Sequence, residues 1–379
     1  MKRLLLFALG LAAVAEGAAP RLNDMQLLGT HNSYHIAPAR MIRKIVSLSG
    51  RVDGRSLDYT HQKLAVQLGK FNVRQVELDV YADPEGGRFT KRLVNLLLGK
   101  SPTASERVMY RRGFKVLHFP DIDFNSNCLT LQLCLLELRK WSEANVRHLP
   151  LVIWIELKEE SLAQHLPAFL GFGVTKLFPT TAAIVSSLDT EIRGVFPRNK
   201  IIIPDDVRGD ERTLEAAVLN NQWPTIESAR GKVLFVLDSS DSARALYVQN
   251  HVALRNRQLF VLAPVGTPEA AIINLTDPLE GNTRTQIAEL VKRGYIVRTR
   301  SDGDTMNARK GDTRQREAAL ASGAQIVSTD YPVPDSRFSS KYFVQIPGGH
   351  PARCNPLRSV NDCTPADVSE PSVQQSASR

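Results

Sequence analysis

Hydrophobic residues are concentrated in short runs that longer segments separate along the chain. Eight runs rich in Val, Ile, Leu, Phe and Tyr begin at Met25, Val73, Phe114, Leu151, Lys200, Lys232, Tyr295 and Ala324. Most are nearly continuous in apolar residues rather than alternating, which indicates strands buried on both faces of a parallel sheet.

The segments between these runs are long, and several have helical spacing, for example residues 129–145 and 283–294. A strand followed by a helix about eight times predicts an α/β fold of the (β/α)₈ TIM-barrel type. An open, doubly wound sheet is the alternative, because periodicity does not reveal whether a sheet closes. Two more apolar runs, from Gln258 and Ala271, fit either an additional strand pair or an elaborated loop.

The N-terminus has the order of a secretory signal peptide: Lys2 and Arg3, the apolar run 4–14, then small residues to Ala19. The run is too short to span a bilayer. We therefore assign residues 1–18 to a signal peptide and 19–351 to the catalytic barrel. Residues 352–379 are expected to form a mobile tail with a possible disulfide loop. A secreted or extracytoplasmic location follows.

The composition is that of a globular protein, with 379 residues, 43% hydrophobic and 23% charged. The four cysteines form two local pairs, and proximity favours Cys128 with Cys134 and Cys354 with Cys363 among the three possible connectivities. A zinc site is less favoured, because neither pair has the usual close spacing and added histidines.

The formal net charge is +9, and it stays basic at +8 without residues 1–18. A basic surface favours anionic partners such as acidic lipid headgroups. Basic stretches with interleaved aromatic residues are not evident, so we expect no nucleic-acid partner. We expect a monomer.

Polar residues fall at the ends of the first four predicted strands, where a barrel of this type carries its catalytic groups. These residues are His31, Asn32, Glu77, Asp79, His118, Glu156 and Lys158.

Glu77 and Asp79 are two residues apart, so their side chains point to the same face of a strand. Two buried carboxylates repel unless a positive charge lies between them. Asn32, Glu77, Asp79 and Glu156 offer the oxygen ligands that Ca²⁺ takes, and Mg²⁺ is less favoured because it prefers a smaller, rigid shell. The alternative is a structural salt bridge from the pair to Arg74 or to Lys158.

Two histidines beside a cation suit phosphoryl transfer, in which one group accepts a proton and another donates one. Lys158 is placed to hold a further phosphate oxygen. For His118 alone, a hydrogen-bonded core histidine is the simpler interpretation, and His35 and His61 are assigned to the surface or to supporting positions. Asp205 and Asp206 end the fifth predicted strand and could join the metal site, although "PDD" is also common in turns.

The segments "GTHNSYH", "VRQVELDVY", "VLHF" and "LVIWIELK" are similar, in order and spacing, to the X-region of phosphatidylinositol-specific phospholipases C. Over about residues 22–350 the chain most resembles the secreted, calcium-dependent phosphoinositide phospholipase C group, and the stretch from Arg298 to Pro332 extends the likeness.

The resemblance implies that His31 and His118 are the catalytic pair and that Asn32, Glu77, Asp79 and Glu156 bind Ca²⁺. It implies attack of the inositol 2-hydroxyl on the 1-phosphate of a phosphoinositide lipid, which gives diacylglycerol and a cyclic inositol phosphate. The enzyme would contact the membrane only peripherally.

Other functions remain open. Glycerophosphodiester phosphodiesterases share the Glu-x-Asp pair and the "DGDT" region, but they typically have Arg-Gly after the first histidine, where this chain has Asn32. A sphingomyelinase-like phosphodiesterase is a further candidate. A glycoside hydrolase using Glu77 and Glu156 would leave both histidines unexplained. A barrel that binds anionic lipid without catalysis would tolerate loss of either histidine.

Overall fold

The computed structural model describes residues 19–48, 53–161, 174–358 and 363–371. The predicted signal peptide, residues 1–18, lies outside this part of the chain. None of the described helices is long and apolar enough to cross a membrane.

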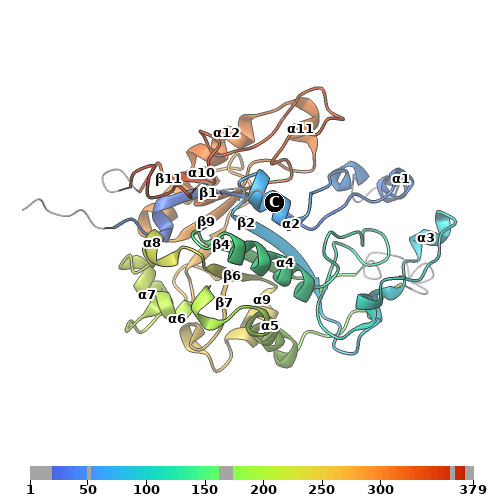
Figure 1. Ribbon diagram of the computed structural model, residues 1–379, viewed down its shortest axis with the longest axis horizontal. Helices are drawn as coiled ribbons and strands as arrows, with labels where there is room; N and C mark the ends of the chain where they lie inside the picture. Colours follow the sequence, from blue (N-terminus) through green and yellow to red (C-terminus); the bar gives the residue numbers. More distant parts are fainter. Residues whose placement is uncertain (1–18, 49–52, 162–173, 359–362, 372–379) are drawn as a thin grey trace, which may run out of the picture.

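Parallel strands curl into an α/β barrel of the TIM type (Figure 1). The hydrogen-bonded order is β5-β6-β4-β2-β1-β10-β9-β8, and β7 also pairs with β6. A parallel bridge between Leu262 and Ile272 joins the end of β7 to β8, so the sheet returns on itself and is not an open, doubly wound sheet. The strands are β1 Met25–Thr30, β2 Gln75–Tyr81, β3 Lys115–Val116, β4 Leu151–Leu157, β5 Ile201–Ile202, β6 Val233–Asp238, β7 Leu259–Val261, β8 Ile272–Asn274, β9 Ile296–Arg300, β10 Ile326–Thr329 and β11 Ala352–Cys354.

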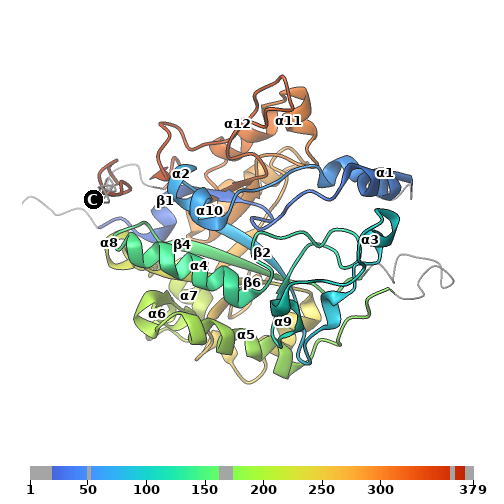
Figure 2. The same ribbon diagram turned by 45° about the vertical axis from the view of Figure 1, so that its right-hand side comes forward.

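Helices lie outside the sheet and between successive parallel strands (Figure 2). The two predicted helical segments are confirmed as α4 and α10. The α-helices are α1 Arg40–Leu48, α2 Leu64–Lys70, α3 Val94–Leu97, α4 Leu131–Ala144, α5 Ala182–Val195, α6 Pro204–Arg208, α7 Leu214–Leu219, α8 Ile226–Ala229, α9 Asp241–Val248, α10 Thr283–Arg293, α11 Met306–Lys310 and α12 Arg314–Ala321. Short 3₁₀ turns include η2, Gly54–Leu57.

The third predicted strand is wrong as a barrel strand. β3 has two residues and runs antiparallel to β2, pairing Val116 with Val80. Between β2 and β3 the only described α-helix is the four-residue α3, too little for the crossover that a parallel strand needs. The crossover to the next parallel strand is made instead by α4, after β3. The runs from Gln258 and Ala271 supply β7 and β8, which are parallel barrel strands rather than an elaborated loop.

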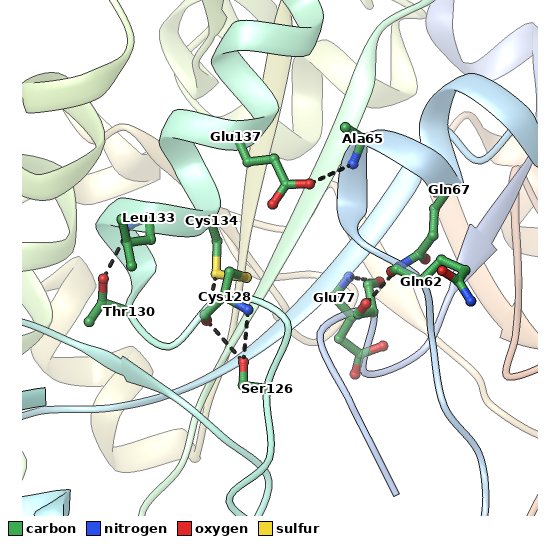
Figure 3. Close-up of a disulfide and its surroundings, with 11 residues drawn as sticks. Gln62, Ala65, Gln67, Glu77, Ser126, Cys128, Thr130, Leu133, Cys134 and Glu137 are labelled. Atoms are coloured by element: carbon green, nitrogen blue, oxygen red, sulfur yellow. Dashed lines mark hydrogen bonds between the residues drawn. A yellow bond between two sulfur atoms is a disulfide. The ribbon is translucent and has the colours of Figure 1, made fainter. Parts of the chain in front are cut away.

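The barrel interior is apolar at its centre because most strand residues are buried on both faces of the sheet. Burial is complete in β2 and nearly so in β4 and β6. Both predicted disulfides are confirmed, Cys128–Cys134 and Cys354–Cys363. The first lies at the start of α4, where Thr130 caps the helix by accepting from the Leu133 N–H (Figure 3).

The segment after Pro351 packs against the barrel, which corrects the expectation of a mobile tail. β11 pairs antiparallel with β1, and Val368 is buried. The Glu370 carboxylate is paired with Arg74 and also accepts the Leu149 N–H at 2.6 Å. One buried valine, one ion pair and one disulfide hold this segment in place. Its sequence has no periodic pattern of apolar residues, so its packing could not be predicted from such a pattern. Residues 372–379 of the predicted tail lie outside the described chain.

Candidate active site

Three carboxylates meet at the C-terminal end of the parallel strands. Glu77 and Asp79 lie on β2 and Glu156 lies on β4, and each offers an oxygen within 4.8 Å of the others. The strands pair in register, with Asp79 beside Glu156. Side chains of directly paired residues point to the same face, so the close approach follows from strand register and needs no loop to arrange it.

Asn32 is brought beside these carboxylates by the turn that follows β1. The Ser33 N–H donates to the Glu77 carbonyl at 2.9 Å, and the Glu77 N–H donates to the Ser33 hydroxyl at 2.8 Å. Asn32 itself has a φ of 43°, in the left-handed region that Asn tolerates better than most residues. Its amide donates to the Tyr59 hydroxyl at 3.0 Å, while its carbonyl oxygen is buried without a hydrogen-bond partner.

Two cations from the barrel wall partly neutralise the cluster. Lys158 Nζ lies 2.8 Å from Glu156 Oε1 and 3.6 Å from Asp79 Oδ2. Arg298, on β9, forms a buried ion pair with Glu77, and its guanidinium lies 4.8 Å from the ring centre of Trp154. A salt bridge to Lys158 is therefore present, whereas Arg74 pairs with Glu370 at the other end of the barrel.

Asp238 is a fourth acid at this edge, which the sequence reasoning missed. It ends β6 and pairs in register with Glu156, and its Oδ2 accepts the Trp154 indole N–H at 3.0 Å. Burial, followed by the charge on Glu156, raises the pKa of Asp238. The same strand-end rule that selected Glu156 would have found it, since this aspartate directly follows the apolar run "VLFVL".

The residues present fit a divalent cation. Both carboxylate oxygens of Asp79 are buried without a hydrogen-bond partner, as is the Asn32 carbonyl oxygen. Burial and then Glu156 raise the pKa of Asp79, and burial raises the pKa of Glu77 to about 7. When Asp238 is counted with Glu77, Asp79 and Glu156 and all four are ionised, Lys158 and Arg298 leave two negative charges uncompensated, and oxygen ligands of this kind suit Ca²⁺.

His31 is held in place by an aspartate. Its Nδ1 lies 2.9 Å from Asp330 Oδ1, and Arg300 donates to the other Asp330 oxygen at 2.9 Å. Burial, and then the positive charge of Arg300, lower the pKa of His31 to about 3. His31 is therefore a neutral imidazole at neutral pH, and with Nδ1–H donating to Asp330 its Nε2 carries the lone pair.

His118 is held in the same way by another aspartate. It follows β3, and its Nδ1 lies 2.8 Å from Asp123 Oδ2. His35 Nε2 contacts the same oxygen at 2.9 Å. Burial opposes the charge on Asp123, but the two histidines hold the pKa of this carboxyl at about 2. Burial lowers the pKa of His118.

His35 and His61 are supporting residues rather than surface residues. His35 stacks on Tyr59 with ring centres 4.3 Å apart, and both are fully or almost fully buried. His61 Nε2 lies 2.9 Å from the His31 carbonyl oxygen. These contacts fix the turn after β1, so they position both His31 and Asn32.

Asp205 and Asp206 are not brought to this edge. β5 pairs with the first two residues of β6, so it ends four residues before the level of Asp238. Asp205 pairs with Arg208 and accepts the Asn256 N–H, in the connection that leads into β7. Asp206 caps α6 by accepting the Ile203 N–H. The sequence "PDD" here begins a helix.

Comparison with known families decides the identity of this arrangement. Residues 20–356 match the family model described as "Phosphoinositide phospholipase C, Ca2+-dependent". The chain belongs to this family. It is therefore a phosphodiesterase of the calcium-dependent phosphatidylinositol-specific phospholipase C type, and the family resemblance drawn from the sequence is confirmed. No curated protein matches the chain.

Solved structures of bacterial enzymes share the fold of this phospholipase. One is a calcium-dependent phosphoinositol-specific phospholipase C from Pseudomonas sp., with 15% identity, a TM-score of 0.53, and coverage of 89% of this chain and 96% of that chain. Another is the Ca²⁺-dependent phosphatidylinositol-specific phospholipase C from Streptomyces antibioticus, with 18% identity, a TM-score of 0.50, and coverage of 83% and 96%.

Proposed function

We propose that this phospholipase cleaves phosphatidylinositol into diacylglycerol and a cyclic inositol phosphate, with His31 and His118 as the acid–base pair and with Ca²⁺ bound by Asn32, Glu77, Asp79 and Glu156. The observation that carries the proposal is the pair of histidine–aspartate contacts near one carboxylate cluster. Both imidazoles lie close enough to Glu156 to influence the pKa of its carboxyl group.

His31 is suited to accept the proton of the inositol 2-hydroxyl. Burial, and then its neighbour Arg300, lower the pKa of the ring, so it stays neutral before substrate binds. Asp330, which holds Nδ1, stabilises the charge that appears on the ring when Nε2 takes the proton. The oxygen freed of its proton then attacks the adjacent phosphorus atom.

His118 is suited to protonate the diacylglycerol oxygen as its bond to phosphorus breaks. Asp123, whose carboxyl stays ionised, orients the ring and stabilises its protonated form. No arginine contacts His118 among the described residues, whereas a guanidinium nitrogen of Arg300 lies 3.5 Å from His31 Nε2. The substrate phosphate, an anion, would further favour the protonated ring.

Ca²⁺ bound by these four residues would withdraw charge from the phosphoryl oxygens and from the attacking hydroxyl. Lys158 lies at the same edge and is free to exchange its contact with Asp79 for a phosphate oxygen. Arg298 and Lys158 balance part of the acidic charge, so the remaining charge matches one divalent ion.

We also propose that the protein is exported, as a monomer that touches the membrane only peripherally. Two disulfides support an oxidising compartment. The proposed division of the chain keeps the barrel at 19–351 as the catalytic unit, with residues 352–358 and 363–371 packed against its opposite end.

Product analysis tests the proposed function. The enzyme is incubated with headgroup-labelled phosphatidylinositol, glycerophosphoinositol and sphingomyelin, with Ca²⁺ and with a calcium chelator. We expect a cyclic inositol phosphate from phosphatidylinositol only, and only with Ca²⁺. Release of choline phosphate, or of glycerol phosphate, would replace the proposal with one of the other phosphodiesterase functions. Turnover that the chelator leaves unchanged would remove the cation from the mechanism.

A further inference from the structure

The positive charge of the chain is concentrated in two connections. Residues 40–55 contain five Lys and Arg against one Asp, and residues 82–113 contain seven against three Asp and Glu. Together they carry eight of the nine net positive charges, so the rest of the chain is close to neutral. Charge segregated in this way orients a molecule toward an anionic partner.

Helix α1, in the first connection, exposes an apolar face. Met41, Ile45 and Leu48 are 50%, 38% and 85% exposed, and their spacing places them on one side of the helix. Arg40 and Lys44, also exposed, lie along one flank of this side. An apolar stripe with a basic flank is typical of helices that lie in a membrane interface.

Helix α3, in the second connection, adds to the same surface. Leu96 is 59% exposed, and the exposed Lys91 and Lys100 lie on either side of the helix in sequence. Both views of the molecule place α3 beside α1 (Figures 1 and 2). We call the surface formed by Arg40, Met41, Lys44, Ile45, Leu48 and Leu96 the α1–α3 face.

The α1–α3 face adjoins the candidate active site. α1 begins five residues after His35, in the connection that follows β1. On the other side, the Val94 N–H of α3 donates to the Asp121 carbonyl at 3.4 Å, two residues before Asp123. A lipid held against this face would therefore have its headgroup near both histidine–aspartate pairs.

An ion-pair hub fixes α1 to the barrel. Asp58 accepts from Arg309 at 2.7 Å and pairs with Arg43 of α1 at 3.0 Å and with Arg337 at 2.5 Å. Ile42 is 2% exposed and anchors an adjacent side of the helix. The exposed apolar residues are thus presented on a helix that is held in place.

We propose that the α1–α3 face docks the enzyme on an anionic lipid bilayer, with Met41, Ile45, Leu48 and Leu96 entering the acyl boundary and Arg40 and Lys44 contacting acidic headgroups. This inference rests on the proposed function for its choice of a lipid partner. A second copy of the chain would bring two strongly basic surfaces together, so charge complementarity favours the bilayer.

Vesicle sedimentation tests the docking. The parent enzyme and three variants are mixed with vesicles of phosphatidylcholine, pure or mixed with phosphatidylserine. The variants are Met41→Ser/Ile45→Ser/Leu48→Ser, Arg40→Gln/Lys44→Gln, and a control, Leu133→Ser/Leu136→Ser. The control residues are 42% and 46% exposed on α4, away from the α1–α3 face.

Each Lys or Arg near an anionic leaflet changes partitioning about fivefold, so the basic double variant should lose about 25-fold on the mixed vesicles. The apolar triple variant should lose about tenfold or more on both vesicle types. The control should stay close to the parent. Turnover of a short-chain, monomeric phosphatidylinositol should be unchanged in all three variants, while turnover on vesicles should fall with partitioning.

Partitioning equal to that of the parent in both test variants would overturn the docking. So would loss of monomeric turnover in a triple variant with a normal melting temperature, because the helix would then belong to the catalytic cavity. If light scattering shows that the parent is a dimer and that the triple variant is not, the α1–α3 face would be a self-association face instead. Should the triple variant fail to fold, Leu48→Ser alone, at the most exposed position, decides the same question.

A parent enzyme that partitions as expected but cleaves neither monomeric nor vesicle phosphatidylinositol would overturn the proposed function and leave the docking standing. Cleavage of both substrates without the expected partitioning would overturn the docking and leave the proposed function standing.

Discussion

The two ends of the barrel both bury ion pairs, but they differ in how completely those pairs are satisfied. We call the end opposite the catalytic cluster, where the C-terminal segment packs, the closed end. There Arg74 donates to Glu370 and to the carbonyl oxygens of Leu68 and Val73, and Glu370 also accepts from Leu149. At the catalytic end, Asp79 and the Asn32 carbonyl oxygen are buried without hydrogen-bond partners.

This difference separates stability from function. A buried charge with a full set of partners holds the chain in one arrangement, while a buried acid without partners disfavours the folded state unless something else binds it. The closed end should therefore respond to substitution in stability alone. The catalytic end should respond in activity and in its dependence on Ca²⁺.

The largest expected effect is at the catalytic end. His31→Ala and His118→Ala should each lower turnover of phosphatidylinositol by about 10² to 10⁴, the usual contribution of a general acid or base. Urea midpoints should change little. His350→Ala, at an exposed position, serves as the control. Turnover near the parent value in either histidine variant would remove that residue from the mechanism.

At the closed end, Glu370→Gln should destabilise the protein by about 3 kcal/mol, because Arg74 would remain buried without its counter-ion. Urea unfolding measures the loss, and turnover of the folded fraction should equal that of the parent. Glu143→Gln breaks an exposed pair with Arg139 and should have no measurable effect. A Glu370→Gln variant as stable as the parent would mean that the C-terminal segment contributes little.

Asp79→Asn should abolish stabilisation by Ca²⁺. A ligand at one hundred times its dissociation constant stabilises a folded protein by about 2.7 kcal/mol, and we expect this gain in the parent but not in the variant. Without Ca²⁺ the variant should be at least as stable as the parent, because it lacks a buried charge. Asp205→Asn, away from the cluster, should keep the stabilisation by Ca²⁺. Loss of this stabilisation in Asp205→Asn would mean that the metal site includes Asp205 and not only the cluster.

The smallest effect is a pH dependence at the closed end. His148 is 2% exposed, accepts from the Ser142 hydroxyl and donates to the Leu149 carbonyl oxygen. Burial lowers its pKa to about 4. The unfolded chain then binds the proton first, so this residue's contribution is complete above pH 6.5 and is lost as the pH falls toward 4.

From pH 6.5 to pH 5 the loss due to His148 should be about 1.5 kcal/mol. Unfolding in urea across this range should show a shallower decline for His148→Gln than for the parent. His350→Gln should decline as the parent does. Parallel curves for His148→Gln and the parent would mean that the buried ring is not what makes the closed end sensitive to acid.

Much of the catalytic end could be predicted from the sequence, because it depends on strand ends. The spacing of Glu77 and Asp79 placed both on one face, and the apolar run before Glu156 placed it on a neighbouring strand. Local patterns of this kind survive folding, since a strand alternates its side chains whatever surrounds it. The family motifs around His31 and His118 are likewise continuous in sequence.

Other features depended on which segments meet in three dimensions. Arg298, Arg300 and Asp330 come from β9 and from the end of β10, and no local pattern connects them to His31 or Glu77. The run at Phe114 resembled a barrel strand, yet its short connection from β2 made it pair antiparallel. Asp205 resembled a metal ligand, yet the early end of β5 kept it from the cluster.

The sequence by itself thus determined most of the strands, both disulfides and three of the carboxylates at one edge of the barrel, because these follow from periodicity and from residues close in the chain. Only the tertiary structure decided which strands form the barrel, the pairing of His31 with Asp330, and the attachment of the C-terminal segment through the pairing of Glu370 with Arg74. Those depend on contacts between residues hundreds of positions apart, where pairing of charges and exclusion of water select one arrangement among many.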